Sequence, residues 1–344
     1  MSNATQSESQ QLEGLKGRRL GPYLSHNPVS ATQIWQWCLA MGEKNPHYRP
    51  GKNQIAPPAM MQMWTMRDID DRYAFGSTDA KPYRVFEDMR VLGYPANVAV
   101  SYNINFHRYL KVGERAMHFS SVVDISEKKS TRLGTGYFVS ERVEYLTVDE
   151  IIFAEAVITY FQYKPAEARS GGDDRVESSI AARGSYDDVT MESDNGRQPG
   201  FPSIDPSRMG VGDLLPELRI PITHKLIVGG AIATQDFIPV HHNASAAQAA
   251  GMSDIFMNIL TTCGLSARYL SDWAGVGNRL KTIKFNLRAP NFPGDVMVMG
   301  GEVTRIEVEP KGALVSVAFK GRNRLGYHTS GEATLGLPNL NTTS

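Results

Sequence analysis

Alternating apolar and polar positions mark two groups of strands in this chain. The first group covers residues 99–106, 117–125, 136–146 and 151–163, and the second covers residues 282–287, 295–308, 313–323 and 328–335. Short turns separate the strands of each group, so consecutive strands should pair antiparallel. A further strand is expected at residues 220–228, ahead of the second group. Two similar groups of strands indicate an α+β protein built from two related units.

Helical spacing of apolar residues precedes each group of strands. The predicted helical segments are residues 30–41, which Ser30 can cap, residues 57–66, and residues 255–273. The second segment carries large, flexible apolar side chains: Met60, Met61, Met63, Trp64 and Met66. These side chains could line a ligand tunnel or simply fill a core, and their spacing fits both.

Changes in composition divide the chain into parts. Residues 1–20 are polar and should form a loose arm, and residues 21–163 the first unit. Residues 164–206 are rich in Gly, Ser, Asp, Arg and Pro without an apolar period, which is typical of a linker. Residues 207–338 should form the second unit, and residues 339–344 a short tail.

Charge and cysteine content restrict the function. The chain of 344 residues has 36 Lys and Arg and 36 Asp and Glu, so its formal net charge is zero. No net charge would therefore attract a nucleic acid or a membrane surface. We also expect no membrane span, no signal peptide and a cytoplasmic location, because no long apolar run occurs. The two cysteines, Cys38 and Cys263, lie in apolar helical patterns and are predicted to be free thiols.

Candidate chemistry lies between the strand predicted at residues 220–228 and the long apolar helix. Asp236 precedes His241 by five residues, and Pro239 keeps the segment between them from being a regular helix. A carboxylate and an imidazole at this spacing can face each other across one water, which they could orient and deprotonate. Alternatively, Asp236 caps a turn and both His241 and His242 are solvated.

The residues around this pair resemble the MaoC-like (R)-specific enoyl-CoA hydratases. Residues 227–275 contain the Asp-x4-His signature of that family followed by its central helix. The stretches Asp254–Leu260 and Arg268–Gly275 resemble the small subunit of the steroid side-chain hydratases. In the first unit, NQIAPPAMMQMWTM (53–66) and NFHRYLKVGE (105–114) are similar to the hydratase domain of the large subunit.

The resemblance implies a double hot dog fold that fuses the two subunits in one chain. It implies an enoyl-CoA hydratase that acts on a bulky steroid side-chain thioester of the 17(20)-ene-22-oyl type, with Asp236 and His241 as the catalytic residues. Backbone N–H groups at the start of the helix would polarise the thioester carbonyl. A general enoyl-CoA hydratase or 3-hydroxyacyl-thioester dehydratase, a non-catalytic acyl-CoA binding protein and a thioesterase are the alternatives.

Superposition of the two halves on their turns places Glu43 under Asp236 and Tyr48 under His241. A tyrosine, whose pKa is ordinarily about 10, is a poor general base at neutral pH. The first unit is therefore predicted to be a degenerate, non-catalytic copy that accommodates the substrate. His47 is a weaker rival for the missing imidazole, one residue out of register.

The resemblance and residue types also suggest a set of substrate-binding residues. They are His242, Asn243, Ile255, Phe256, Met257, Met60, Met63, Trp64, Arg268 and Arg288, with Phe292 near the CoA end. No metal and no cofactor are expected, because the CoA thioester is itself the substrate. We expect a homodimer, and a thiolase-like aldolase or a DUF35-type domain as a partner that acts on the product. The resemblance includes a zinc-binding, OB-like domain in the bacterial large subunit, and we expect no counterpart of it in the linker, which lacks a CxxC motif.

Overall fold

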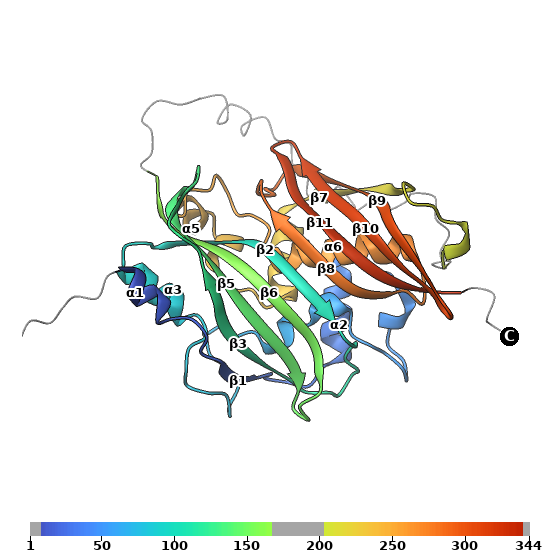
Figure 1. Ribbon diagram of the computed structural model, residues 1–344, viewed down its shortest axis with the longest axis horizontal. Coiled ribbons are helices and arrows are strands. Elements are labelled where there is room, and N and C mark those ends of the chain that lie inside the picture. The colour runs from blue at the N-terminus through green and yellow to red at the C-terminus, as the bar shows by residue number, and fades with distance from the viewer. Residues whose placement is uncertain (1–7, 167–202, 340–344) are drawn as a thin grey trace, which may run out of the picture.

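The computed structural model describes residues 8–166 and 203–339 and shows one large antiparallel sheet that supports several helices (Figure 1). The strands are β1 (Leu20–Leu24), β2 (Ala96–Phe106), β3 (Ala116–Ile125), β4 (Lys129–Ser130), β5 (Gly134–Thr147), β6 (Ile152–Pro165), β7 (Leu214–Ile222), β8 (Arg279–Leu287), β9 (Asp295–Glu309), β10 (Gly312–Asn323) and β11 (Gly326–Pro338). The eight strands predicted in two groups are thereby confirmed, with most of them extended at their ends.

The order of strands in the sheet repeats in mirror fashion about its centre. The order is β1-β3-β5-β6-β2 for the first unit and β8-β11-β10-β9-β7 for the second. Strands β2 and β8 join the units through an antiparallel ladder from Ser101 opposite Asn286 to Asn105 opposite Thr282. Each unit thus contributes five strands in equivalent places, which confirms the predicted double hot dog arrangement.

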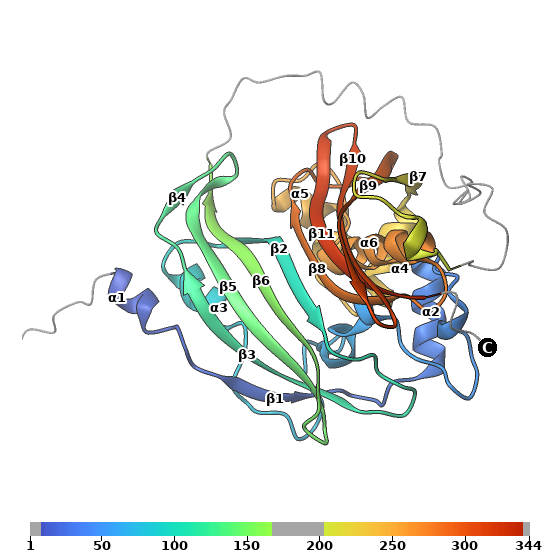
Figure 2. The same ribbon diagram turned by 45° about the vertical axis from the view of Figure 1, so that its right-hand side comes forward.

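The helices gather on one side of the sheet. They are α1 (Glu8–Glu13), α2 (Ala31–Met41), α3 (Arg84–Val91), α4 (His224–Ala233), α5 (Ala244–Ala249) and α6 (Ile259–Ala274), with the 3₁₀ helices η1 (Pro46–Tyr48), η2 (Pro58–Met60), η3 (Met63–Thr65), η4 (Pro206–Arg208) and η5 (Pro239–His241). Helices α2, α4 and α6 contact one another beside the strands of the second unit (Figure 2).

Helix α6 is the central helix of the second unit. Nearly all of its side chains are buried, including the polar residues Thr261, Ser266 and Arg268, because other elements enclose the helix. Asn258 caps its start by accepting a hydrogen bond from the backbone N–H of Thr261, and Gly275 ends it with a positive φ of 78°. A Cβ atom at Gly264 would lie 2.9 Å from the Trp37 ring, so this glycine lets α2 pack closely on α6.

The first unit has no matching central helix. The segment predicted as a helix over residues 57–66 instead forms the two short turns η2 and η3, so that prediction is wrong. Pro57 adopts a ψ of 136°, which lies outside the helical region and is ordinary for a residue that precedes a proline, and an isolated 3₁₀ turn follows it. Two 3₁₀ turns therefore follow η1 in the first unit, and only the short helix α3 precedes β2 where α6 precedes β8 in the second unit.

Three other boundaries differ from the predictions. The strand expected at residues 220–228 ends at Ile222, because Thr223 caps α4 by accepting from the N–H of Leu226. The central helix begins at Ile259 rather than at residue 255. The arm expected to be loose contains α1, in which Leu12 is buried and Glu8 accepts a hydrogen bond from Tyr94.

The predicted linker, residues 164–206, lies mostly outside the described residues. At its edges, β6 extends to Pro165 and η4 begins at Pro206. Cys38 and Cys263 are both free thiols, as predicted.

Candidate active site

The same turn follows α2 in the first unit and α4 in the second. Gly42 and Gln235 both adopt left-handed backbone conformations, with φ of 67° and 55°. The next residues, Glu43 and Asp236, each donate a backbone hydrogen bond to the carbonyl five residues earlier, at 2.8 and 2.9 Å. Because a left-handed conformation is uncommon for a residue other than glycine, the turn at Gln235 is held by its surroundings.

Each turn then leads into a 3₁₀ helix that begins with a proline. Pro46 opens η1 and Pro239 opens η5, and these short helices end at Tyr48 and His241, respectively. The backbone conformations therefore confirm the predicted superposition, which places Glu43 opposite Asp236 and Tyr48 opposite His241.

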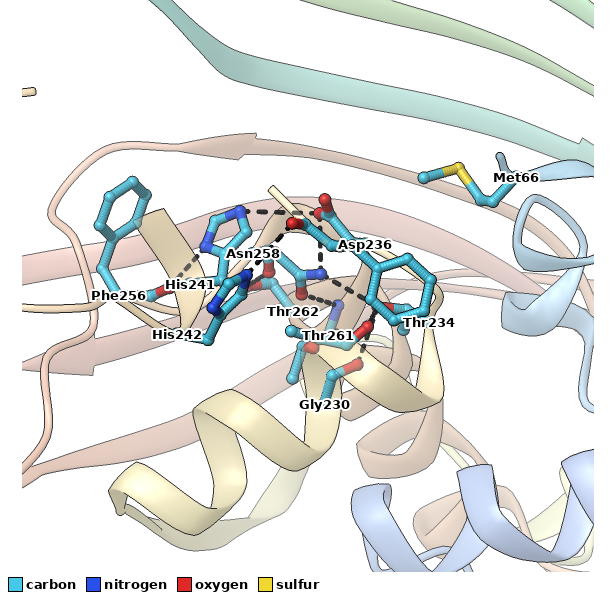
Figure 3. A network of polar contacts seen from close by, with 12 residues as sticks. Met66, Gly230, Thr234, Asp236, His241, His242, Phe256, Asn258, Thr261 and Thr262 are labelled. Atoms are coloured by element: carbon cyan, nitrogen blue, oxygen red, sulfur yellow. Dashed lines mark hydrogen bonds and ion pairs between the residues drawn. The ribbon is translucent and has the colours of Figure 1, made fainter. Parts of the chain in front are cut away.

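Asp236 is buried at the N-terminal end of α6 (Figure 3). Its Oδ2 atom accepts a hydrogen bond of 2.9 Å from the side-chain amide of Asn258, the residue that caps the helix. The same amide nitrogen lies 3.0 Å from the hydroxyl of Thr234, which in turn donates to the Gly230 carbonyl. These bonds fix one carboxylate oxygen, whereas Oδ1 has no hydrogen-bond partner among the described residues.

His241 is held in one orientation by Phe256. The Nδ1 atom of the imidazole lies 2.7 Å from the carbonyl oxygen of Phe256, and since a carbonyl can only accept, Nδ1 carries the proton. The Phe256 ring also packs edge-on against the imidazole, with 5.1 Å between the ring centroids. This tautomer leaves the lone pair of Nε2 available to accept a proton.

The two catalytic candidates face each other without a direct hydrogen bond. Nε2 of His241 lies 3.6 Å from Oδ2 of Asp236, which is longer than a normal hydrogen bond. Two acceptors at this separation suit a water that donates one O–H to each of them. The positive end of the α6 dipole lies beside the carboxylate, because Asn258 both caps the helix and donates to Asp236.

The first unit supplies aromatic side chains to the surroundings of this pair. Burial raises the pKa of Tyr83 and of Tyr160, and the negative charge of Asp236 adds to both shifts. The two phenols are therefore within electrostatic reach of the carboxylate. Met66, which follows η3, lies on the same side of the polar network as Asp236 (Figure 3).

The chain is similar to known proteins of one family. Residues 212–318 match the family described as MaoC like domain. The chain is 41% identical over 127 residues to the beta subunit of the 3-oxo-4,17-pregnadiene-20-carboxyl-CoA hydratase of Mycobacterium tuberculosis, covering 37% of this chain and 95% of that subunit. The chain belongs to the MaoC family.

The alpha subunit of the same Mycobacterium tuberculosis hydratase is also similar. It is 30% identical over 172 residues, which is 47% of this chain and 53% of that subunit, so this chain spans about half the length of the alpha subunit. Similarity to both subunits is consistent with the predicted fusion. The relatives are hydratases by name, and this MaoC protein is an enzyme of the lyase class.

Solved structures share the fold. A MaoC-like dehydratase superposes with a TM-score of 0.67 at 18% identity, covering 95% of this chain and 99% of that one. A Mycobacterium tuberculosis protein described as a double hot dog superposes with a TM-score of 0.59 at 13% identity, covering 95% and 97%. Over residues 8–166 and 203–339, none of the helices combines the length and apolarity needed to cross a bilayer.

Several predicted substrate-binding residues lie beside the pair. Ile255 and Met257 are buried on either side of Phe256, in the segment that leads into α6. His242 is exposed and lies 3.2 Å from the Phe237 carbonyl, and Asn243 caps α5 by accepting from the N–H of Ala246. The last two residues therefore have evident structural roles, and a contact with substrate remains a prediction for both.

The predicted residues of the first unit lie in its core. Met60, Met63 and Trp64 are all buried in the hydrophobic cluster that spans both units. Phe292 is buried as well, and its backbone N–H donates to Asp295. Core packing thus accounts for these side chains, and the tunnel remains a prediction.

The two predicted arginines lie in contrasting environments. Arg288 is exposed and remains a candidate for the CoA phosphates. The side chain of Arg268 is only 2% exposed, pairs with Asp272 at 3.1 Å and donates to the Met41 carbonyl at 3.0 Å. This guanidinium joins α6 to α2 and cannot reach a CoA phosphate, so its assignment to substrate binding is corrected.

The equivalent position in the first unit combines a partly buried Glu43 with a buried Tyr48 and lacks an imidazole. Glu43 accepts hydrogen bonds from the backbone N–H groups of Lys44 and Asn45. Burial, aided by the charge of Asp272, raises the pKa of Glu43 to about 7. Burial also raises the pKa of Tyr48 well above its ordinary value, so this phenol cannot act as a base near neutral pH.

Asn258 and Thr234 are the site residues that the sequence analysis missed. An asparagine ahead of a long apolar run is a recognisable helix cap, and that signal could have placed the start of α6 correctly. The second role of Asn258, as a donor to Asp236, depends on the tertiary contact between α4 and α6, which no local pattern contains.

Proposed function

We propose that this chain hydrates α,β-unsaturated acyl-CoA thioesters. The observation that carries the proposal is the placement of Asp236 Oδ2 and His241 Nε2 as two acceptors 3.6 Å apart in a buried site. A water that donates to both has its oxygen lone pair directed away from them, toward a substrate. The MaoC relatives named as hydratases support the same reaction.

In the proposed reaction the water oxygen attacks C3 of the enoyl thioester while one of its protons passes to His241 Nε2. The electrons of the double bond move toward the thioester carbonyl, where the N-terminus of α6 stabilises the developing negative charge. C2 then takes a proton from the pair, so that Asp236 and His241 return to their initial state. The product is a 3-hydroxyacyl-CoA, and the same steps in reverse describe dehydration.

The acyl group is proposed to be a steroid side chain of the 17(20)-ene-22-oyl type. Two features support this choice: similarity to both subunits of a hydratase named for a pregnadiene-carboxyl-CoA, and the short turns η2 and η3 in place of a central helix in the first unit. Two 3₁₀ turns fill less space than a long helix, which favours a bulky substrate.

The alternative functions have less support. A thioesterase of this fold ordinarily uses a carboxylate on the central helix, whereas the first two turns of α6 carry no acid. A non-catalytic acyl-CoA binding protein would not need a buried acid and base that face each other. The second unit retains such a pair in Asp236 and His241. A general enoyl-CoA hydratase with a broad substrate range is the nearest competitor.

Product masses test the proposal. The purified chain is incubated separately with crotonyl-CoA and with 3-oxo-4,17-pregnadiene-20-carboxyl-CoA. Hydration adds the mass of one water, about 18 units, and releases no free CoA. Release of free CoA would support the thioesterase, and no turnover of either thioester would contradict hydration.

We also propose a cytoplasmic homodimer whose product is consumed by a thiolase-like aldolase. The reason for the aldolase is chemical, because a 3-hydroxyacyl thioester is the substrate of a retro-aldol cleavage. Size-exclusion chromatography with light scattering would measure the assembly, and a coupled aldolase assay would measure the second step.

A further inference from the structure

Three consecutive residues ahead of α6 hold the catalytic pair. The Phe256 carbonyl accepts a hydrogen bond of 2.7 Å from Nδ1 of His241 (Figure 3). The side-chain amide of Asn258 donates to Asp236 at 2.9 Å. Met257 lies between these two residues and is buried. Whatever fixes the backbone at Met257 therefore also fixes the groups that orient both catalytic side chains.

The loop between β8 and β9, residues 288–294, contacts that backbone. The N–H of Met257 donates to the carbonyl of Asn291 at 3.1 Å. Asn291 is 0% exposed, and its side-chain amide nitrogen lies 3.3 Å from the sulfur of Met297 and 3.7 Å from that of Met257. Thioether sulfurs are weak acceptors, so burial of this amide is costly. Its retention in the core points to a role beyond packing.

Asn323, at the end of β10, holds the β8–β9 loop in place. Its side-chain amide donates to Oδ1 of Asn291 and to the carbonyl of Pro290, each at 2.8 Å. These two bonds orient the Asn291 amide and fasten two consecutive residues of the loop to the sheet. Asn323 is half-buried and reaches the catalytic segment only through Asn291 and Met257.

His328 on β11 makes a second connection, between the same loop and the first turn of α6. Its Nδ1 lies 2.7 Å from the Ala289 carbonyl, and since a carbonyl can only accept, Nδ1 carries the proton. Nε2 then accepts from the Thr262 hydroxyl at 2.8 Å. Burial lowers the pKa of His328 to about 4, so the ring is neutral at neutral pH. The N–H of Thr262 donates to the Asn258 carbonyl, which brings this connection to the start of the helix.

We infer that the β8–β9 loop positions the catalytic pair, and that Asn291 and His328 are its positioning residues. The inference rests on the proposed hydratase function and concerns the same site. Both residues are buried and act on the reaction only through other residues. Oδ2 of Asp236 and Nε2 of His241 must share one water across 3.6 Å, so a small shift of residues 256–258 should slow the reaction more than it weakens substrate binding.

Two pairs of variants test the two connections by steady-state kinetics. Thr262→Val removes the hydroxyl that His328 accepts and keeps the shape of the side chain, whereas Thr262→Ser keeps the hydroxyl. Asn323→Ala removes both bonds to the loop, and Arg322→Ala, at an exposed position of the same strand, is its control. Thr262→Val and Asn323→Ala should each lower kcat about tenfold and change KM less than about twofold. The serine variant and the Arg322 control should stay close to the wild type.

The substrate for these assays is crotonyl-CoA or 3-oxo-4,17-pregnadiene-20-carboxyl-CoA, whichever the wild type hydrates faster. Circular dichroism and thermal unfolding check that each variant is folded. If Asn323→Ala does not fold, Asn323→Asp replaces it, because aspartate keeps the shape of the side chain but lacks the two donors.

A spectroscopic test needs no substrate. In the full chain labelled with ¹⁵N in its histidines, correlation spectra at pH 8 show which nitrogen of each ring carries the proton, and the signals of His241 are those missing from His241→Gln. We expect the Nδ1–H tautomer of His241 in the wild type, as its bond to Phe256 requires. Thr262→Val and Asn323→Ala should shift these signals or show both tautomers, and the two matched variants should not.

Unchanged His241 signals in both Thr262→Val and Asn323→Ala would overturn the inference, even if kcat fell. Changes of equal size in Thr262→Ser and Arg322→Ala would overturn it as well, because they would show that any substitution nearby disturbs the ring. If the wild type hydrates neither thioester, the proposed hydratase function fails, and the His241 spectra alone then decide whether the loop positions the pair.

Discussion

The side-chain amide of Asn258 donates to Oδ2 of Asp236 at 2.9 Å, so one residue both caps the central helix and positions the catalytic carboxylate. The carboxylate is therefore tied to the positive end of α6 and keeps its second oxygen for another partner. This contact couples the start of a helix to the reaction, and its two roles can be separated by mutation.

Asn258→Ser and Asn258→Ala separate those roles. Serine retains the cap but lacks the amide that reaches Asp236, whereas alanine loses both. Both variants should lower kcat for enoyl-CoA hydration by roughly 10- to 100-fold, because a donor to the catalytic carboxylate is lost. Only the alanine variant should also lose about 1 kcal/mol of unfolding free energy. Denaturant unfolding and steady-state kinetics measure the two effects, and a serine variant with wild-type kcat would refute the positioning role.

The buried carboxyl of Glu43 should make stability depend on pH. Its pKa is about 7 in the folded chain and about 4.5 when unfolded, so the folded state holds the proton more tightly. The contribution of Glu43 to the free energy of unfolding is thus greatest below pH 4.5. It falls as the pH rises from 4.5 to about 7. Glu43→Gln should raise Tm by roughly 2–4 °C at pH 8 and have little effect at pH 4.

The control for this measurement is Glu87→Gln on α3, where the side chain is exposed. Its Tm difference from the wild type should stay small and constant across the same range of pH. A Glu43→Gln effect that is equally flat would show that the carboxyl group is not buried in the folded chain.

Met66 should set the size of the acyl group. Met66→Phe replaces a flexible side chain that lines a narrow cavity of the first unit, together with Tyr83 and Tyr160, with a rigid ring. Activity on a polycyclic enoyl-CoA should fall about tenfold more than activity on crotonyl-CoA, and Met66→Leu should change both little. Equal effects on the two substrates would favour a general hydratase.

Local patterns in the sequence predict most of the strands and the catalytic turn. Alternation places the long strands of both units, and the repeated proline turn correctly aligns Glu43 with Asp236. The segment at 57–66 was predicted as a helix because its methionines have helical spacing, but it forms two 3₁₀ turns after the extended backbone of Pro57. At this segment the spacing of the apolar residues does not predict the backbone conformation.

Long-range contacts account for the remaining differences. The residue type of Arg268 suggests a cation for the CoA phosphates, but the packing of α2 on α6 buries it beside Asp272 and the Met41 carbonyl. Asn258 approaches Asp236 only because α4 and α6 pack together, and that contact involves residues 22 positions apart. Neither relationship can be read from the periodicity of one segment.

The central claim is that the second unit catalyses and the first is a degenerate copy, and paired substitutions at equivalent positions test it most directly. The measurement is kcat for hydration of the preferred enoyl-CoA by Asp236→Asn, His241→Ala, Glu43→Gln and Tyr48→Phe, with each fold checked by circular dichroism. We predict losses on the order of 10²- to 10⁴-fold for the first two variants. The last two should lose no more than about threefold, because Tyr48 stands in place of the imidazole and the first unit has no complete acid/base pair. Losses of similar size on both sides, or full activity without Asp236 and His241, would contradict the account.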